Sequence, residues 1–183
     1  MAMFYHGNRG WYCRRCVKFG DVPLPEDTSR IVDSEYRLKF SLTDRQKEIS
    51  EKLCSYVNNG KSVLLEAVCG AGKTEIIYEM ISQQLNEGKK VGFAIARRQV
   101  VIEIAERLAS SFPHLTVICQ GHTDVVMGDL VVCTTHQLYR YRNYFDVLII
   151  DEPDAFPYKG NDTLKGIARH SCKGVMVYLT ATP

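Results

Sequence analysis

No stretch of this 183-residue sequence approaches the ~20 consecutive apolar residues that cross a lipid bilayer. The first residues also lack the basic segment followed by an apolar one with which a secretory leader begins. Internal repeats and low-complexity tracts are absent as well, so no repeat architecture is expected. We therefore expect a cytoplasmic protein without an integral membrane segment.

Cysteine does not follow the pattern of a disulfide framework, because the seven cysteines are odd in number and scattered along the chain.

With 45% hydrophobic residues the chain can bury a full core, and its length fits one domain with a modest appendage. Residues 1–20 hold four basic residues and no acidic one, and residues 21–40 resemble a connector with two prolines and mixed charge. We expect 1–40 to form a basic N-terminal arm and 41–183 to form the folded domain.

From residue 41 the sequence alternates between helical and strand patterns. The strands are nearly continuous apolar runs, which is typical of a mainly parallel sheet covered by helices on both faces. The first helix is expected to start at Thr43, to place Ile49, Leu53, Tyr56 and Val57 on one face, and to stop at Gly60. Further helices are expected at 74–87, 98–111 and near 136–142, and strands at 62–66, 90–95, 116–119, 130–133, 145–150 and 174–179.

The segment 67–74 has the composition of a phosphate-binding loop between a strand and a helix. Glycines let backbone N–H groups converge on phosphate oxygens at a helix N-terminus. Lys73 can reach the β- and γ-phosphates, and the hydroxyl of Thr74 can bind Mg²⁺. The residues assigned to the nucleotide are Ala67, Gly70, Ala71, Gly72, Lys73 and Thr74.

Two carboxylates, Asp151 and Glu152, follow the apolar strand 145–150. Asp151 can hold the same Mg²⁺ as Thr74, and Glu152 can orient or deprotonate the attacking water. Each motif stands at a predicted strand end, so together they favour nucleotide hydrolysis, with Lys73, Asp151 and Glu152 as catalytic residues. The sequence lacks the Asn-Lys-x-Asp guanine reader and the Leu-Ser-Gly-Gly-Gln signature, which disfavours GTPases and transporter ATPases.

Two further segments near the phosphate loop can be explained by purely structural roles. Gly60-Lys61-Ser62 imitates the end of a phosphate loop, but it precedes a strand, and we interpret it as a helix stop followed by a strand start. Gln46 lies one helix before the loop, where its amide can read adenine. Thr43 and Gln46 are also spaced as a helix capping box, and the two roles do not exclude each other.

Candidate nucleic-acid contacts stand at two other predicted strand ends. Arg97 and Arg98 follow strand 90–95, and a solvated helix start is the alternative reading. Thr134, Thr135 and His136 follow strand 130–133, where hydroxyl and N–H groups suit a phosphate backbone, although N-capping explains one threonine. Rings and cations then interleave as in single-strand binders, although a plain amphipathic helix explains this run as well: Tyr139, Arg140, Tyr141, Arg142 and Tyr144.

In this order the segments resemble the motif series of superfamily 2 helicases. Residues 134–138, 150–158 and 179–183 further resemble the ComFA family of competence proteins, whose acidic box is extended by Ala-Phe-Pro-Tyr. The resemblance covers essentially the whole chain. It implies a RecA-like P-loop NTPase lobe that uses ATP and Mg²⁺, with Thr180 and Thr182 coupling the nucleotide to movement. It also implies an ATP-driven single-stranded-DNA translocase at the inner face of the cytoplasmic membrane, with other competence DNA-uptake proteins as partners.

The chain departs from the family pattern in two ways. Only one Cys-x-x-Cys pair, Cys13 and Cys16, is present where the family has two, so these residues could hold half of a zinc site that needs four ligands. The sequence also stops at the last motif of the first lobe, before the second lobe and its arginine finger. We expect this chain alone to bind ATP and Mg²⁺ with little hydrolysis. Two alternatives are an ATP- and DNA-binding fragment without appreciable catalysis, and a DEAD-like helicase lobe acting in DNA repair or replication restart.

Overall fold

The computed structural model describes residues 3–5, 11–13, 41–67, 72–122, 127–155 and 157–181. Near the N-terminus, β1 (Met3–Tyr5) and β2 (Trp11–Cys13) form an antiparallel pair. The rest of the expected basic arm, Cys16 included, lies outside the described residues. Within the part of the chain that is described, no helix is both long enough and apolar enough to cross a membrane.

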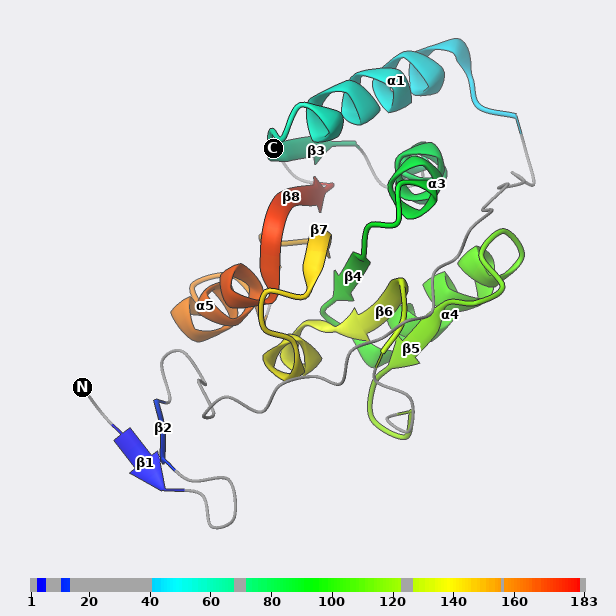
Figure 1. Cartoon of the computed structure of the whole chain (residues 1–183). Coiled ribbons are helices and arrows are strands. Elements are labelled where there is room, and N and C mark those ends of the chain that lie inside the picture. Colours follow the sequence, from blue (N-terminus) through cyan, green and yellow to red (C-terminus); the bar gives the residue numbers. More distant parts are fainter. Residues whose placement is uncertain are drawn as a thin grey trace.

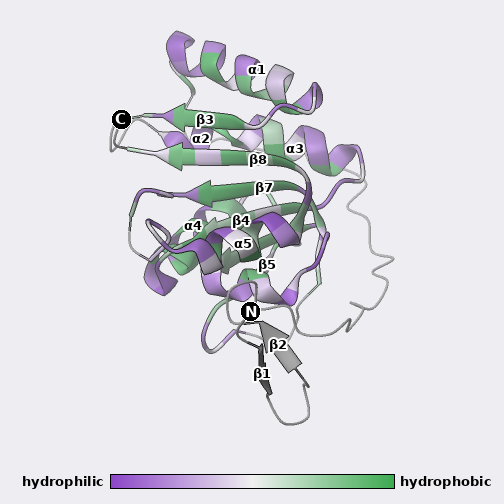
Figure 2. Cartoon of the chain, turned by 90° about the vertical axis from the view of Figure 1, so that its left-hand side faces the viewer, coloured by the Kyte–Doolittle hydropathy of each residue, from purple (hydrophilic) through white to green (hydrophobic). Residues whose placement is uncertain are grey.

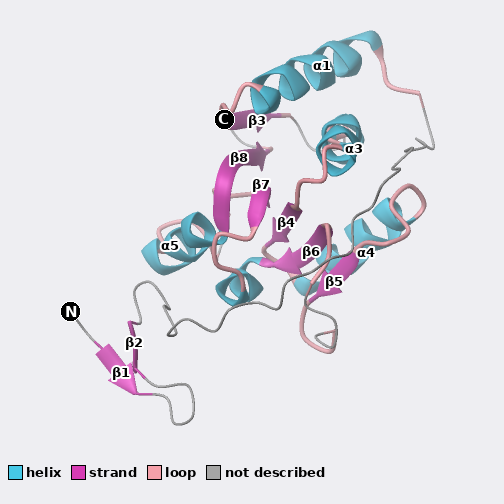
Figure 3. Ribbon diagram, viewed as in Figure 1, coloured by secondary structure: helices cyan, strands magenta, loops and turns pink. Residues whose placement is uncertain are grey.

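The core of the molecule is a six-stranded sheet in the order β3-β8-β7-β4-β6-β5 (Figures 1 and 3). Every neighbouring pair in this sheet is parallel, which confirms the predicted α/β architecture. The strands are β3 (Val63–Glu66), β4 (Val91–Ile95), β5 (Thr116–Ile118), β6 (Leu130–Thr134), β7 (Phe145–Asp151) and β8 (Cys172–Thr180).

Helices cover both faces of this sheet (Figure 1). On one face lie α1 (Asp44–Asn58), α2 (Lys73–Ile76), α3 (Tyr78–Asn86) and α4 (Arg98–Ala109), and on the other lie the 3₁₀ helix η2 (Thr135–Arg140) and α5 (Asp162–Ser171). Successive strand residues alternate between the two cores: Ile149 packs with the first group of helices and Ile150 with the second. The central strands are therefore mostly hydrophobic (Figure 2).

Helix α1 begins as the sequence predicts. The Thr43 N–H donates to Gln46 Oε1 at 2.8 Å and the Gln46 N–H donates to Thr43 Oγ1 at 3.3 Å, so the capping box is confirmed. The helix ends at Asn58, and Gly60 takes a φ of +70° before strand β3, which confirms that the Gly-Lys-Ser triplet is a helix stop. One core assignment was wrong, because Tyr56 is 48% exposed.

Two other features differ from the sequence-based expectation. The helix expected at 74–87 is divided at Ile77, whose N–H bonds the Thr74 carbonyl at 3.3 Å in a tighter turn. Helix α5 was not predicted, although Asn161 caps it by accepting the Leu164 N–H, and Leu164 and Ile167 are buried three residues apart. Gly166 in its interior weakens the helical pattern in the sequence.

The run of interleaved rings and cations after β6 is not a row of stacking platforms. Tyr141 is 2% exposed and Tyr144 is 8% exposed, and their rings pack against Phe145 with centroids 4.7 and 5.0 Å away. Both tyrosines therefore belong to the core under η2 and α5. Of the three tyrosines, Tyr139 alone stays partly exposed, with the Arg140 guanidinium 5.2 Å from its ring centre.

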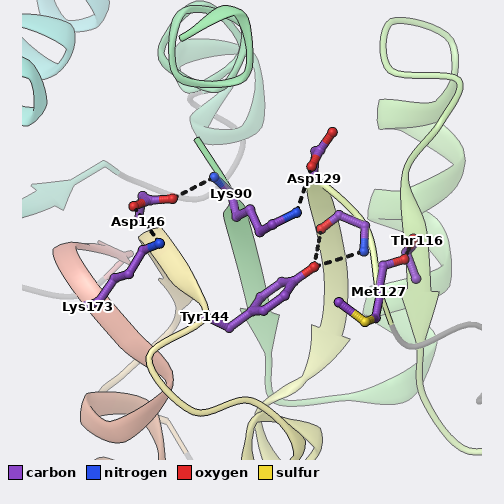
Figure 4. Close-up of polar contacts among 8 residues, drawn as sticks. Lys90, Thr116, Met127, Asp129, Tyr144, Asp146 and Lys173 are labelled. Carbon is purple, nitrogen blue, oxygen red and sulfur yellow. Dashed lines mark hydrogen bonds and ion pairs between the residues drawn. The ribbon is translucent and has the colours of Figure 1, made fainter. Parts of the chain in front are cut away.

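A polar network joins the strands at the amino-terminal edge of the sheet (Figure 4). Lys90 lies at its centre, with its N–H donating to Asp146 and its ammonium contacting Asp129, both at 2.9 Å. The Tyr144 hydroxyl donates to the Gly128 carbonyl at 3.0 Å and accepts the Gly128 N–H at 3.1 Å. These contacts tie the starts of β4, β6 and β7 together, at the edge of the sheet opposite the predicted site.

Candidate nucleotide-binding site

The carboxyl ends of five strands, β3, β8, β7, β4 and β6, bring the predicted site residues to one edge of the sheet. In the strand register Glu66 pairs with Thr180, and Asp151 pairs with Leu179. Ile95, just before Arg97, pairs with Thr134. Ligands of parallel α/β sheets bind at this edge, so the topology gathers the predicted nucleotide and DNA contacts on the same side of the molecule.

Gly72 and α2 form the described part of the phosphate-binding segment, which follows β3. Gly72 has a φ of +73°, a left-handed conformation that favours glycine, and a Cβ atom on it would also displace the amide of Gln46, whose Nε2 lies 2.7 Å from that position. Lys73 and Thr74 form the first turn of α2, and Thr74 is 9% exposed. Ala67 continues β3 by donating its N–H to the Thr180 carbonyl at 3.0 Å. Gly70 and Ala71 lie outside the described residues.

Lys73 and Glu152, which are 79 residues apart in sequence, form an ion pair with Nζ and Oε1 2.5 Å apart. Glu152 has a φ of +50°, a conformation that is uncommon for a non-glycine residue and marks a constrained position. Its N–H donates to the Leu179 carbonyl at 2.8 Å, and its second carboxylate oxygen accepts the Ala181 N–H at 3.5 Å. The backbone turn at Glu152 therefore holds its carboxylate on the lysine of the phosphate loop.

Asp151 ends β7 beside this ion pair. Burial raises the pKa of its carboxyl to about 6, Lys73 opposes this shift, and Glu152 adds to it. A divalent cation would offset the cost of ionising this half-buried carboxyl, and carboxylate and hydroxyl oxygens are ligands that Mg²⁺ prefers. The chemistry of Asp151 and Thr74 therefore fits the predicted Mg²⁺ role. Among the described residues there is no cluster of three or more His, Cys, Asp or Glu side chains suited to a metal.

Thr180 connects the last strand to the acidic motif. It is 1% exposed, and its hydroxyl donates to Asp154 Oδ2 at 3.0 Å. The predicted coupling residue is thus bonded to the segment that carries Glu152. Thr182, the second residue assigned to coupling, lies outside the described part.

A cavity of about 400 Å³ opens beside the phosphate-binding segment. Gln46 lines it together with Lys73 and Thr74, and its Nε2 atom faces Gly72 while its Oε1 atom caps α1. The geometry is therefore compatible with both roles that the sequence left open for Gln46. The complete lining is Ser41, Leu42, Gln46, Gly72, Lys73, Thr74, Glu75 and Arg107. No sequence pattern points to Arg107, because it stands in the last turn of α4 with no motif around it.

The candidate DNA contacts occupy the same edge, on β4 and β6. Arg97 precedes α4 and is exposed, while Arg98 donates its Nε–H to the Gln120 carbonyl at 2.8 Å. Thr134 is partly exposed at the start of η2 and His136 is exposed. Thr135 is 1% exposed, so its side chain does not face solvent in this conformation.

Residues 39–183 match the family described as type III restriction enzyme, res subunit. The chain belongs to this family. It is 37% identical to the competence protein ComFA of Bacillus subtilis, with 98% of this chain and 42% of that protein aligned. It is 35% identical to ComFA of Streptococcus pneumoniae, with 94% of this chain and 42% of that protein aligned. The chain thus spans about two fifths of the length of these relatives.

Among solved structures, the fold is similar to the SWI2/SNF2 ATPase core of Sulfolobus solfataricus, which was determined in complex with double-stranded DNA. The TM-score is 0.69 at 20% identity, and the match covers 81% of this chain and 33% of the other. At this identity the likeness shows the fold alone. Together with the family match and the two relatives, it makes the chain a ComFA-like lobe of the superfamily 2 helicase type.

Proposed function

We propose that this chain is the ATP-binding lobe of an ATP-driven single-stranded-DNA translocase that takes part in DNA uptake during natural competence. The observation that carries the proposal is the contact between Lys73 and Glu152. It joins the phosphate-binding segment to the acidic motif at the edge of the sheet where α/β proteins bind ligands. The identity to two competence proteins supports the specific role in DNA uptake.

In this proposal the phosphates of ATP lie at the start of α2, where N–H groups and the helix dipole favour anions. Lys73 contacts the β- and γ-phosphates, Thr74 and Asp151 hold Mg²⁺, and Glu152 activates the water once Lys73 has turned to the nucleotide. Thr180 transmits the state of the acidic motif through its bond to Asp154. Gln46 contacts the adenine from the wall of the cavity.

DNA is proposed to bind at the ends of β4 and β6, through Arg97, Arg98, Thr134 and the N–H groups at the start of η2. The basic residues among 1–20 are proposed to contribute further contacts to DNA. Such contacts go to the phosphate backbone, so binding should show no sequence preference and should weaken steeply with salt. A salt-insensitive or strongly sequence-selective interaction would contradict this assignment. The place of action is proposed to be the cytoplasm, with peripheral association at the inner face of the membrane.

The test is ATP turnover with and without single-stranded DNA, measured for this chain and for a longer form extended to the length of its relatives. We expect DNA to stimulate turnover in the longer form, and the Glu152→Gln variant of that form to bind ATP without hydrolysing it. For the 183 residues alone we expect binding with little turnover. In the helicase family that the chain resembles, a second lobe supplies an arginine finger, and such a residue contributes roughly 10³–10⁵ in rate. Absence of DNA stimulation in the longer form would refute the proposal.

Strong turnover by the 183-residue chain alone would contradict the expected need for a second lobe. In that case a steep dependence of the rate on protein concentration would show that self-association activates the chain. ATP and DNA binding without turnover in either form would instead favour the second candidate, a binding module without catalysis.

A further inference from the structure

The cavity next to the phosphate-binding segment is lined by two chemically different sets of groups. Lys73 and Thr74, at the start of α2, supply the groups that suit phosphates. The rest of the lining includes Leu42 and Gln46, before and within α1, and Arg107 from the last turn of α4. This second set offers an apolar side chain, an amide and a guanidinium, which are groups suited to a flat heteroaromatic base.

Both the guanidinium and the backbone carbonyl of Arg107 are bound by neighbouring residues. Its guanidinium forms an ion pair with Glu75, which stands two residues after Lys73 on α2. Its carbonyl accepts the Tyr78 hydroxyl at 2.9 Å and the Ser110 hydroxyl at 3.0 Å. The Tyr78 ring packs on Phe112 with centroids 5.5 Å apart, so the turn of α4 that carries Arg107 is fixed against α3.

The ion pair with Glu75 determines whether Arg107 is better suited to contact the phosphates or the base of a nucleotide. A guanidinium that already faces a carboxylate has most of its charge compensated, and the same carboxylate would repel a polyphosphate brought close to it. The flat face of a guanidinium remains available for stacking on an aromatic ring, which is a contact that arginine makes well and lysine does not. The Arg107 side chain is 53% exposed, so much of its surface is open to a ligand, while the Glu75 side chain is 26% exposed.

We propose that Arg107 is the stacking platform for the adenine base, with Glu75 as the residue that positions its guanidinium in the lining of the cavity that it shares with Gln46. The inference rests on the proposed nucleotide site and adds to it a base-binding residue that carries none of the phosphate contact. Its consequence is that Arg107 contributes to the binding of ATP and contributes nothing to the binding of a triphosphate chain without a base.

The test compares the affinities of Mg²⁺-bound ATP and Mg²⁺-bound inorganic tripolyphosphate for the 183-residue chain by calorimetry. The variants are Arg107→Ala, Arg107→Lys, Lys73→Ala and a matched control, Arg169→Ala, in the last turn of α5 on the other face of the sheet. We expect Arg107→Ala to weaken ATP about 3- to 30-fold more than it weakens tripolyphosphate, the range of a cation–π contact, because the unpaired Glu75 carboxylate repels the phosphates of both ligands alike. Arg107→Lys keeps the charge but loses the planar face, and we expect most of the same loss for ATP.

Three outcomes would overturn the inference. Equal losses for ATP and tripolyphosphate in Arg107→Ala would show that the guanidinium acts on the phosphates. Unchanged ATP affinity in both Arg107 variants would show that the pair with Glu75 only joins α2 to α4. Full ATP affinity in Arg107→Lys would show that charge alone suffices, and this variant also decides the question if Arg107→Ala unfolds.

Failure of the proposed function itself looks different. In that case the wild-type chain would bind neither ligand, or Lys73→Ala would leave the affinity for both ligands unchanged.

Discussion

Replacing Glu152 by Gln is expected to tighten ATP binding, even though it removes the residue proposed to activate water. The Lys73 ammonium lies 2.5 Å from the Glu152 carboxylate, and the two side chains are 16% and 32% exposed. ATP must take the lysine away from this carboxylate before the phosphates can use it. The carboxylate then also stands near the phosphates, which adds repulsion. Glutamine keeps the shape and removes both costs.

The size of this effect follows from the burial of the pair. Fully exposed ion pairs contribute about 0–1 kcal/mol, and removing one partner of a buried pair costs about 3–5 kcal/mol. The pair between Lys73 and Glu152 is partly buried, so we assign it about 1–2 kcal/mol. That corresponds to a Kd for ATP lowered by about 5- to 30-fold. The gain should shrink as salt is raised, because part of the pair is screened by solvent.

The assay is a calorimetric titration of Mg²⁺-bound ATP into the wild type and Glu152→Gln. Glu87→Gln is the matched control, because Glu87 forms a surface ion pair with Lys89 at 2.5 Å just after α3. We expect the control to match the wild type within about twofold. Equal or weaker binding by Glu152→Gln would refute the reasoning, since it would show that the carboxylate does not compete with ATP for Lys73.

Three further predictions concern other parts of the structure. Tyr144→Phe should lower the free energy of unfolding by about 1–3 kcal/mol in urea, because it strands the polar groups of Gly128; an unchanged midpoint would contradict this. Burial raises the pKa of the Cys133 thiol from 9.0 to about 12. The thiol therefore ionises at lower pH in the unfolded chain than in the folded one, and the free energy of unfolding should fall by about 1.4 kcal/mol per pH unit between pH 9 and about 12. Urea unfolding at pH 8 and 10 should show a smaller fall in Cys133→Ala, and an equal fall would exclude this thiol as the cause. Thr180→Val should keep ATP affinity within about threefold but reduce DNA-stimulated turnover in the longer form, because it removes the bond to Asp154; undiminished stimulation would argue against coupling through this hydroxyl.

The architecture was predictable because parallel strands leave strong local signals. Apolar runs such as Val147–Ile150 can be buried only in a sheet covered on both faces, and the carboxyl ends of such strands share one edge. From the sequence alone, that rule predicts that Asp151 and Thr180 lie near the phosphate-binding segment. The capping box at Thr43 was equally readable, because it depends on residues three positions apart.

Features that depend on contacts across the fold could not be predicted in this way. Tyr141 and Tyr144 would show the same interleaved sequence pattern whether their rings stacked on DNA or packed in a core. Their burial depends on the packing of η2 and α5 against β7, which the local sequence does not reveal. Arg107 reaches the cavity because α4 packs beside α2, a relation that no local pattern records. The pairing of Lys73 with Glu152 likewise depends on the unusual backbone conformation at Glu152.

The most direct test of the central claim, that this edge of the sheet binds ATP, is a titration of Mg²⁺-bound ATP into the wild type and Lys73→Ala. We predict saturable binding by the wild type and a loss of affinity of about 10- to 150-fold in the variant, the range expected for hydrogen bonds to charged groups. Urea unfolding of both proteins should confirm that the variant remains folded. Equal affinity of a folded Lys73→Ala for ATP would contradict the assignment of the nucleotide site.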